Sequence, residues 1–457
     1  MPPHRKIAVV IDSVKRLQRI GATANLLNLL QKQHPAELAE VFNELPDKQR
    51  RSAFNTLLGK NSRLAIEALS ELGFELGASM LIEYPADELA RLFQELPSDD
   101  AAAWIGHLPD ELSVQVLELM RRKDSSEVKN LLEYADQTAG RIMNPNVFAL
   151  DEDLTAGQAI EALQGSREVE MVFYLYVVDE RRHLVGVVSL RRLLLVSPET
   201  SLKRIMTAEL ISARVDMDQE DVARQVADYN LLAIPVVDHE NKLAGIITVD
   251  DVIDVIKDEA TEDIYRLAGV ASDEHVFTPA AEAWRKRLPW LAVNLVTAVL
   301  AALVVQQFQA TIDRVVALAA FMTVIASMGG NAATQTLTVI VRGIAIGELT
   351  LGNSRQTLGK EALVALANGL TFGIVGAGIA WWIVGNPYFG GILALAMVIN
   401  LLVAAGAATL IPLALRALKV DPALASAVFI TTLTDIFGFL AFLGLGTLFL
   451  QYLERAG

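Results

Sequence analysis

The last 170 residues of the chain contain five long apolar stretches, and this feature constrains the fold more than any other. The stretches cover about residues 288–310, 315–341, 362–384, 389–415 and 423–450. Each is near or above the roughly 20 residues that an α-helix needs to cross a bilayer. Backbone polar groups inside lipid must be satisfied within the segment, so helices are the expected form. We therefore expect a transmembrane domain of five spans over residues 288–457.

Charge divides the chain near Arg287. Of 39 Lys and Arg and 54 Asp and Glu, residues 288–457 hold 7 and 6, so residues 1–287 hold 32 and 48 and carry a net charge of −16. Such a surface repels nucleic acid and attracts cations, so we expect no nucleic-acid partner. Cysteine is absent, which excludes disulfides and thiolate metal sites. The sequence has no nucleophile with a base, no phosphate-cradling loop and no redox ligand cluster, so we expect no enzymatic activity.

Basic residues around the spans predict the orientation in the membrane. Eight flank the spans on the side of the N-terminal half, and two lie on the other side. The eight are Arg285, Lys286, Arg287, Arg342, Arg355, Lys360, Arg416 and Lys419, and the two are Arg314 and Arg455. Basic loops favour the cytoplasm, and residues 1–19 have no signal-peptide core. We expect an inner-membrane protein with a cytoplasmic N-terminus and a periplasmic C-terminus.

The charged half contains two kinds of repeat. Short amphipathic helices closed by proline recur, as in HPAELAEVFNELP at 34–46 and YPADELARLFQELP at 84–97, and they predict a helical superhelix within residues 1–137. A β/α duplication follows, in which YLYVVDERRHLVGVVSLRRLL is echoed by LAIPVVDHENKLAGIITVDDVI. Gly186 and Gly245 stand 59 residues apart in this duplication. The pattern is typical of a βαββα unit.

The two units, expected at residues 138–201 and 202–261, resemble a pair of cystathionine-beta-synthase (CBS) domains. A charged connecting helix from about Ile264 to Arg287, within residues 262–287, would join them to the first span. Four further motifs are TVDDVIDVIKDEATEDI at 248–264, GGNAATQ at 329–335, DPALAS at 421–426 and TTLTDIFG at 431–438. With these motifs, the order of parts resembles the MgtE family of magnesium channels. The resemblance implies a homodimer that conducts hydrated Mg2+ along its two-fold axis and is closed by cytosolic Mg2+.

Asp435 is the first candidate for an ion-binding residue, because it lies about a dozen residues into the fifth span. A carboxylate near mid-membrane costs about 2.5–3.5 kcal/mol even on the lenient insertion scale, so we expect it to face a water-filled path. In a dimer it would form a facing pair that a divalent cation neutralises. The resemblance places Thr431, Thr432 and Asp421 in the same pore. The alternative is a carboxylate that is hydrogen-bonded to Thr431, Thr432 or a neighbouring helix.

The second span carries polar residues and two glycines close to its middle. Gly329 and Gly330 weaken the helix, and polar stretches interrupted by glycine at membrane depth normally line a cavity. By resemblance, Asn331 and Gln335 would line the pore. The alternative is close helix packing through small residues. The chain departs from the family pattern at Ala333, Thr334 and Ala405, and Asn400 lies near the last of these.

An acidic belt in the CBS pair and connecting helix is the candidate for a cation sensor. Residues 251, 254, 258 and 262 share one helix face. By resemblance the sensing acids are Asp99, Asp218, Glu220, Asp250, Asp251, Asp254, Glu259, Glu262 and Asp263. Mg2+ would relieve their repulsion and favour a compact state in which the connecting helix plugs the pore. The alternative is a solvated helix face, and Asn230 and Ala103 stand where the family pattern has acids.

ATP is a second ligand to consider, because CBS pairs often bind adenine nucleotides. Thr248 and Asp251 offer a hydroxyl and a carboxylate in the second repeat, whereas the first repeat has Ser189 but Arg192 in place of the acid. The sequence therefore leaves ATP binding open. It also leaves two other functions open: ion-coupled secondary transport of Mg2+, Mn2+ or Co2+, and a membrane-tethered cation or nucleotide sensor that transports nothing.

Overall fold

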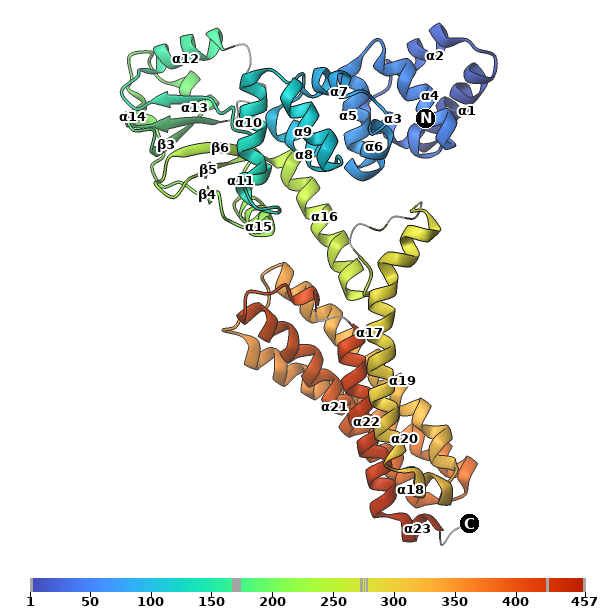
Figure 1. Cartoon of the computed structure of the whole chain (residues 1–457). Coiled ribbons are helices and arrows are strands. Elements are labelled where there is room, and N and C mark those ends of the chain that lie inside the picture. The colour runs from blue at the N-terminus through green and yellow to red at the C-terminus, as the bar shows by residue number, and fades with distance from the viewer. Residues whose placement is uncertain are drawn as a thin grey trace. The chain divides into compact units, whose positions relative to one another are not determined.

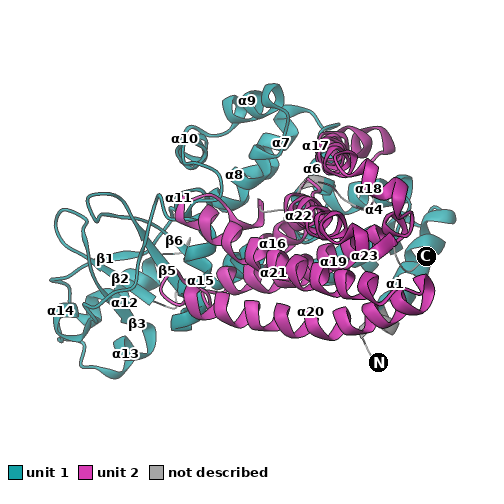
Figure 2. Ribbon diagram, turned by 90° about the horizontal axis from the view of Figure 1, so that it is seen from below, with its two compact units in different colours: residues 1–256 teal, residues 257–457 magenta. Residues whose placement is uncertain are grey.

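The computed structural model describes residues 3–166, 174–271, 274, 276, 278–424 and 427–454. Arg455, one of the residues used to predict the orientation, and residues 425–426 of the DPALAS motif lie outside the described residues. The chain separates into two compact units, Met1–Ile256 and Lys257–Gly457, which are coloured separately in Figure 2. The elements of each unit are labelled in Figure 1.

Ten helices form the first part of unit 1. They are α1 (Pro3–Arg19), α2 (Thr23–Leu30), α3 (Pro35–Asn43), α4 (Asp47–Leu58), α5 (Ser62–Leu72), α6 (Phe74–Leu81), α7 (Ala86–Phe93), α8 (Ser98–Gly106), α9 (Asp110–Leu119) and α10 (Arg122–Leu132). Pro46, Pro85, Pro97 and Pro109 each stand directly before a helix, where the missing N–H has no structural cost. The prolines therefore begin the next helix more directly than they close the previous one.

The helical part has a continuous aromatic core. Trp104 is fully buried, stacks on Phe93 at 6.4 Å between ring centroids and meets Phe74 edge-on at 4.9 Å. Gly77 lies against the Trp104 ring, so no side chain fits at that position. Aromatic pairs of this kind add to the stabilisation that burial of apolar area supplies. The core thus holds α6, α7 and α8 together.

The duplication appears as two three-stranded sheets with the same strand order. The first repeat contains α11 (Ala139–Ile142), β1 (Ala149–Asp151), α12 (Ala156–Gly165), β2 (Tyr174–Val178), β3 (Leu184–Ser189) and α13 (Leu190–Leu195). The second contains α14 (Leu202–Ile205), β4 (Ala213–Arg214), α15 (Gln219–Tyr229), β5 (Ala233–Val237), β6 (Leu243–Thr248) and α16 (Val249–Leu267). In each sheet the first two strands are parallel and the last two are antiparallel.

The two sheets share irregularities as well as strand order. The register shifts between Val177 and Val178 in one sheet and between Val236 and Val237 in the other, at equivalent positions 59 residues apart. A Cβ on Gly245 would lie 2.7 Å from the Asn144 carbonyl oxygen, and one on Gly186 would overlap Met206. The duplication predicted from the sequence is confirmed, and its two glycines are required for close packing.

Unit 2 contains five helices long and apolar enough to cross a membrane, as predicted. They are α17 (Ala280–Gln306), α19 (Ala317–Ala345), α20 (Ser354–Val384), α21 (Pro387–Ala417) and α22 (Ala427–Leu448). Shorter helices are α18 (Gln309–Arg314), the 3-10 turn η1 (Pro422–Leu424) and α23 (Leu450–Glu454). Phe321, Phe389 and Phe442 pack edge-to-face and join α19, α21 and α22.

The connecting segment differs from the expectation of one helix over 264–287. The helix α16 ends at Leu267, and α17 begins at Ala280. Gly269 has a φ of +68°, a left-handed conformation that glycine adopts without strain, and Pro279 stands at the start of α17. Between them Glu274, which is 4% exposed, is ion-paired with Arg287. The predicted helix is therefore wrong as a single element, because Gly269 follows the end of one helix and Pro279 precedes the start of the next.

Candidate ion pathway and cation-sensing cluster

Asp435 is the ninth of the 22 residues of α22, about 4 Å from the middle of the helix at 1.5 Å per residue. Its side chain is half-buried, and it makes no hydrogen bond or ion pair with another described residue. The hydroxyls of Thr431 and Thr432 do not reach it, since both donate to the Val428 carbonyl, at 3.1 and 2.7 Å. The hydrogen bond to Thr431 or Thr432 that the sequence left open is therefore not made.

The Thr431 carbonyl, which the family resemblance assigns to the ion, already has a partner. Thr434 donates its hydroxyl to this oxygen at 2.8 Å. A Cβ on Gly330 would lie 3.4 Å from the Thr431 Cγ2, so α19 and α22 are in close contact at this level. A carbonyl oxygen has two lone pairs, and the Thr434 hydroxyl occupies one of them.

Asn331 and Gln335 lie on α19, which is a continuous helix through Gly329 and Gly330. The glycines therefore do not interrupt the helix, and they allow close approach of α22 and α21. Both polar side chains line a cavity of about 680 Å³ between α19 and α20. The other polar residues of its lining are Thr334, Thr338 and Asn368. Asp435, Thr431 and Thr432 are not among the residues that line this cavity.

Asp421 directly precedes η1, and both of its oxygens are engaged. One carboxylate oxygen accepts the Ala423 N–H at 2.8 Å, and the carboxylate is also ion-paired with Arg266 near the end of α16. Arg266 is also ion-paired with Glu262, one turn earlier in the same helix. A carboxylate that is held by an arginine is a poor ligand for a passing cation, so the structure favours a structural role for Asp421 in this state.

Glu361 is a buried acid of unit 2 that the sequence analysis did not single out. It lies in α20 with 6% of its surface exposed, accepts the Thr336 hydroxyl at 3.2 Å and approaches the Lys360 ammonium at 3.1 Å. The signal was present, since Glu361 directly precedes the third apolar stretch. A buried acid at a membrane boundary is a functional candidate by default.

In unit 1, acids from α8 and α16 face one another. Burial raises the pKa of Asp99 to about 8, with added repulsion from Asp100 and Asp251. Burial likewise raises the pKa of Asp100 to about 6, with repulsion from Asp251, Asp250 and other acids. Asn144 donates to the Asp99 carboxyl at 3.2 Å. The structure therefore brings together Asp99, Asp250, Asp251 and Asp254 of the predicted sensor and adds Asp100, an acid that the sequence analysis passed over.

The remaining predicted acids have local partners. Asp218 caps α15 by accepting the Glu220 N–H at 2.8 Å, and Glu220 is ion-paired with Arg224 at 3.5 Å. Glu259, Glu262 and Asp263 lie in unit 2, where burial raises the pKa of Asp263 against the opposing effect of Arg266. Within the described parts of the chain, no three His, Asp or Glu side chains come close enough to hold one metal ion directly. Any cation at the α8–α16 cluster would keep part of its water shell, as Mg2+ commonly does.

Thr248 and Asp251, the two candidate nucleotide-binding residues, are hydrogen-bonded to each other. Thr248 donates its hydroxyl to the Asp251 carboxylate at 2.6 Å and its N–H at 3.3 Å. The same carboxylate lies within the acidic cluster, where burial raises its pKa. In the first repeat Ser189 caps α13 through the Arg192 N–H at 3.2 Å. The geometry thus assigns Asp251 to the acidic cluster more directly than to a nucleotide.

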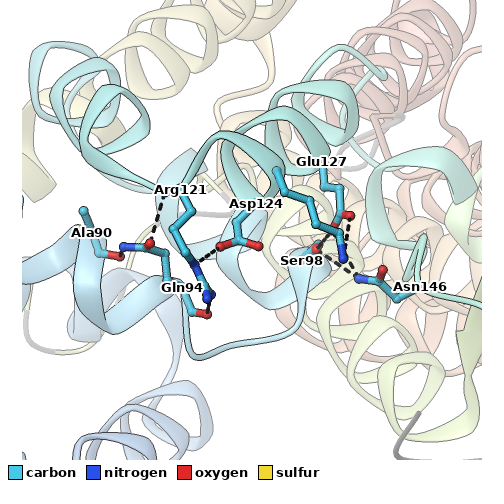
Figure 3. A network of polar contacts seen from close by, with 8 residues as sticks. Ala90, Gln94, Ser98, Arg121, Asp124, Glu127 and Asn146 are labelled. Carbon is cyan, nitrogen blue, oxygen red and sulfur yellow. Dashed lines mark hydrogen bonds and ion pairs between the residues drawn. The ribbon is translucent and has the colours of Figure 1, made fainter. Parts of the chain in front are cut away.

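A network of hydrogen bonds, some of them to charged groups, joins α8 and α10 to the loop before β1 (Figure 3). Ser98 donates to Glu127 at 2.7 Å, and Asn146 donates to both Ser98 and Glu127, at 3.3 and 3.2 Å. Gln94, Arg121 and Asp124 form a second group next to it. These hydrogen bonds hold the helical part to the first repeat.

Family models and relatives match the chain in the same order as its parts. Residues 33–137 match the MgtE intracellular N domain, residues 139–199 and 202–258 the CBS domain, and residues 322–445 the MgtE divalent cation transporter. The chain is 36% identical over 337 residues to the magnesium transporter MgtE of Thermus thermophilus, covering 73% of this chain and 75% of that protein. It is 36% identical over 338 residues to the magnesium transporter MgtE of Bacillus subtilis, covering 74% and 75%.

A solved structure resembles unit 1. It is the cytosolic domain of the Mg2+ channel MgtE in complex with ATP, which is 34% identical, has a TM-score of 0.51 and covers 54% of this chain and 99% of that chain. Both of these relatives, which match over most of the chain, are named as magnesium transporters. Five membrane-length helices, two CBS repeats and an acidic helical part accompany this similarity. The chain belongs to the MgtE family of magnesium transporters.

Proposed function

We propose that the chain is a Mg2+ channel in which two copies form a pore on their two-fold axis, with Asp435 of each copy facing the ion. One observation carries this proposal: a half-buried carboxylate stands near the middle of α22 with no partner among the described residues. A lone carboxylate at membrane depth is costly unless water or a cation reaches it. Two such groups about 8 Å apart would repel by about 2 kcal/mol at an effective dielectric near 20. A hydrated divalent cation between them removes that cost.

Mg2+ flux into liposomes tests this role of Asp435. We expect Asp435→Ala to abolish flux while the protein still elutes as the native oligomer. Asp313→Asn is the matched control, because Asp313 is an exposed acid of α18 whose contact is a hydrogen bond from Gln309 at 2.9 Å. Native flux in Asp435→Ala would reject the pore assignment. Dependence of flux on a proton or sodium gradient would favour coupled transport, and no flux by the native chain would favour a sensor without transport.

We also propose that the α8–α16 acids Asp99, Asp100, Asp250, Asp251 and Asp254 sense cytosolic Mg2+. Burial next to like charges raises the pKa values of Asp99, Asp100 and Asp251, and a divalent cation stabilises the charged form of such a cluster. Five further acids would also respond to Mg2+. They are Glu259, Glu262 and Asp263 of α16, and Asp218 and Glu220 at the start of α15. Binding would favour the compact, closed state because Mg2+ has higher affinity for it.

We assign unit 1 to the cytoplasm and the C-terminus to the periplasmic side of the inner membrane, in line with the basic loops of unit 2. Similarity to a cytosolic domain solved with ATP supports a test of ATP binding on the full chain. We expect weak binding, because the first repeat has Arg192 in place of an acid and the second uses Asp251 in the acidic cluster. Titration of native protein and Arg192→Asp with ATP, followed by calorimetry, checks this expectation.

A further inference from the structure

Asn400 of α21 is a buried amide that the proposed function does not use. Its surface is 1% exposed. The side-chain Nδ2 donates to the Ile325 carbonyl of α19 at 3.0 Å. Its Oδ1 is buried and has no hydrogen-bond partner among the residues that the structure describes. An orphaned buried acceptor of this kind calls for an explanation other than stability.

Two glycines enclose the amide. A Cβ on Gly438 of α22 would lie 2.7, 2.9 and 3.0 Å from its Nδ2, Cγ and Oδ1. A Cβ on Gly329 of α19 would overlap Nδ2 and would lie 3.2 Å from the Thr434 Cβ. Real Cβ atoms do not occupy such positions, so the amide fits only because both neighbours are glycine. Asn400 therefore occupies the point where α19, α21 and α22 meet.

This point lies next to the turn that carries the proposed ion ligand. Thr434 precedes Asp435 in α22, and Gly438 follows it by three residues, close to one helical turn. Both border the space around Asn400. An apolar side chain would fill that space without burying an acceptor that lacks a donor. Proteins leave a buried polar group without a hydrogen bond mainly where function requires a fixed geometry.

We propose that Asn400 is a positioning residue, an amide wedge that sets the spacing between α19 and α22 around Asp435. The spacing fixes the width of the path that a hydrated divalent cation meets. The hydrogen bond to Ile325 fixes the wedge to α19, and contact with Gly438 transmits its position to α22. The part of this inference that concerns the ion rests on the proposed function, whereas the part that concerns helix spacing does not.

Cross-linking tests the spacing without any transport. The chain has no cysteine, so Gly330→Cys with Thr431→Cys is the only thiol pair. A Cβ on Gly330 would lie 4.0 Å from the Thr431 Cβ, within the roughly 3.5–4.5 Å that a disulfide requires. In the otherwise native chain we expect efficient oxidation. Adding Gly438→Ala should lower the yield about fivefold or more, since overpacking moves α22. Adding Asn400→Ala to that variant should restore it.

Gly444→Ala is the matched control on the same helix, because a Cβ there meets nothing within 4 Å. The wedge is overturned if Gly438→Ala lowers the yield no more than Gly444→Ala does. It is equally overturned if Asn400→Ala brings no recovery. Recovery by the double change would support a steric fit between Asn400 and Gly438, which a general loss of stability does not produce.

Transport measures the consequence for the ion. In liposomes we expect Asn400→Ala to raise the half-saturating Mg2+ concentration and to change the ratio of Mg2+ to Ca2+ flux, each by about fivefold. Thr409→Val is the control, because Thr409 is also a fully buried polar residue of α21, and its hydroxyl has no hydrogen-bond partner in the described part of the chain. Unchanged half-saturation and flux ratio in Asn400→Ala reject the role in the pathway. If the cross-linking yields are as predicted but the native chain shows no Mg2+ flux, the role of Asn400 in helix spacing stands and the proposed function is rejected.

Discussion

At the scale of single residues, proton binding at Asp99 has the clearest consequence. Its pKa is about 8 in the folded chain against an ordinary value of 3.8. Between these values the folded form binds more protons than the unfolded form, so the stability of unit 1 falls as pH rises through this window. Asp100, with a pKa of about 6, adds to the same trend. If these acids bind Mg2+ as proposed, protons and Mg2+ compete for them.

Hydrogen exchange of α8 in the full-length protein tests this competition. Without Mg2+ we expect protection of α8 to fall as the pH rises from about 4 to about 8, and Mg2+ to restore it. Asp99→Asn should keep α8 protected at pH 9 without Mg2+, because the charge that opposes packing is removed. Asp110→Asn is the control, since Asp110 is an exposed acid in the first turn of α9. The same loss of protection in Asp99→Asn as in the native chain would contradict the assignment.

At the scale of helices and strands, local patterns predicted most of the fold. The five apolar stretches correspond to five long helices, and the duplication to two matching sheets. The connecting helix was wrong, although Gly269 and Pro279 were visible signals of its ends. Contacts between residues that are distant in the sequence could not be predicted from local patterns. Glu361 contacts Thr336, which is 25 residues away, and Asn400 contacts Ile325, which is 75 residues away. Such pairs depend on which helices pack together, and periodicity carries no information on that.

The crossing of α20 and α21 supports a prediction with a built-in control. A Cβ on Gly390 would lie 2.6 Å from the Ala377 carbonyl oxygen, whereas one on the adjacent Gly391 would meet nothing within 4 Å. We expect Gly390→Ala to lower the free energy of unfolding by about 1–3 kcal/mol through overpacking. Gly391→Ala should have little effect. Thermal melts of the two variants in detergent provide the measurement, and equal melting temperatures would show that the helices are not as closely packed as described.

At the scale of the whole molecule, charge and hydropathy are divided along the chain near Arg287. Residues 1–287 hold 48 of the 54 acids, and residues 288–457 hold the five long apolar helices. The division would separate the proposed cation sensor from the proposed cation pathway along the chain. A sensor that is built from many weakly coupled acids can be altered without loss of the pore. This separation allows the two proposed roles to be tested one at a time.

Neutralising Asp251, Asp254 and Glu259 together to Asn, Asn and Gln tests the sensor. We expect Mg2+ conduction to persist, because these residues lie outside the membrane-spanning helices. The internal Mg2+ concentration that inhibits conduction should rise at least about tenfold, because the neutral side chains no longer repel one another and so bind Mg2+ less strongly in the closed state. Patch recordings with varied internal Mg2+ provide the measurement. Inhibition at the native concentration would remove the sensor assignment, and loss of conduction would show that the acids serve the pore.

The contacts of Ser98 with Glu127 and Asn146 are direct hydrogen bonds, whereas the proposed sensor places a cation among the acids beside them (Figure 3). On that proposal, withdrawal of Mg2+ restores repulsion at the α8–α16 edge and leaves these hydrogen bonds intact. We therefore expect the helical part to rotate about these hydrogen bonds and not to separate from the first repeat. A tethered part re-engages in a first-order step, so the speed of shut-off would not depend on the abundance of the protein.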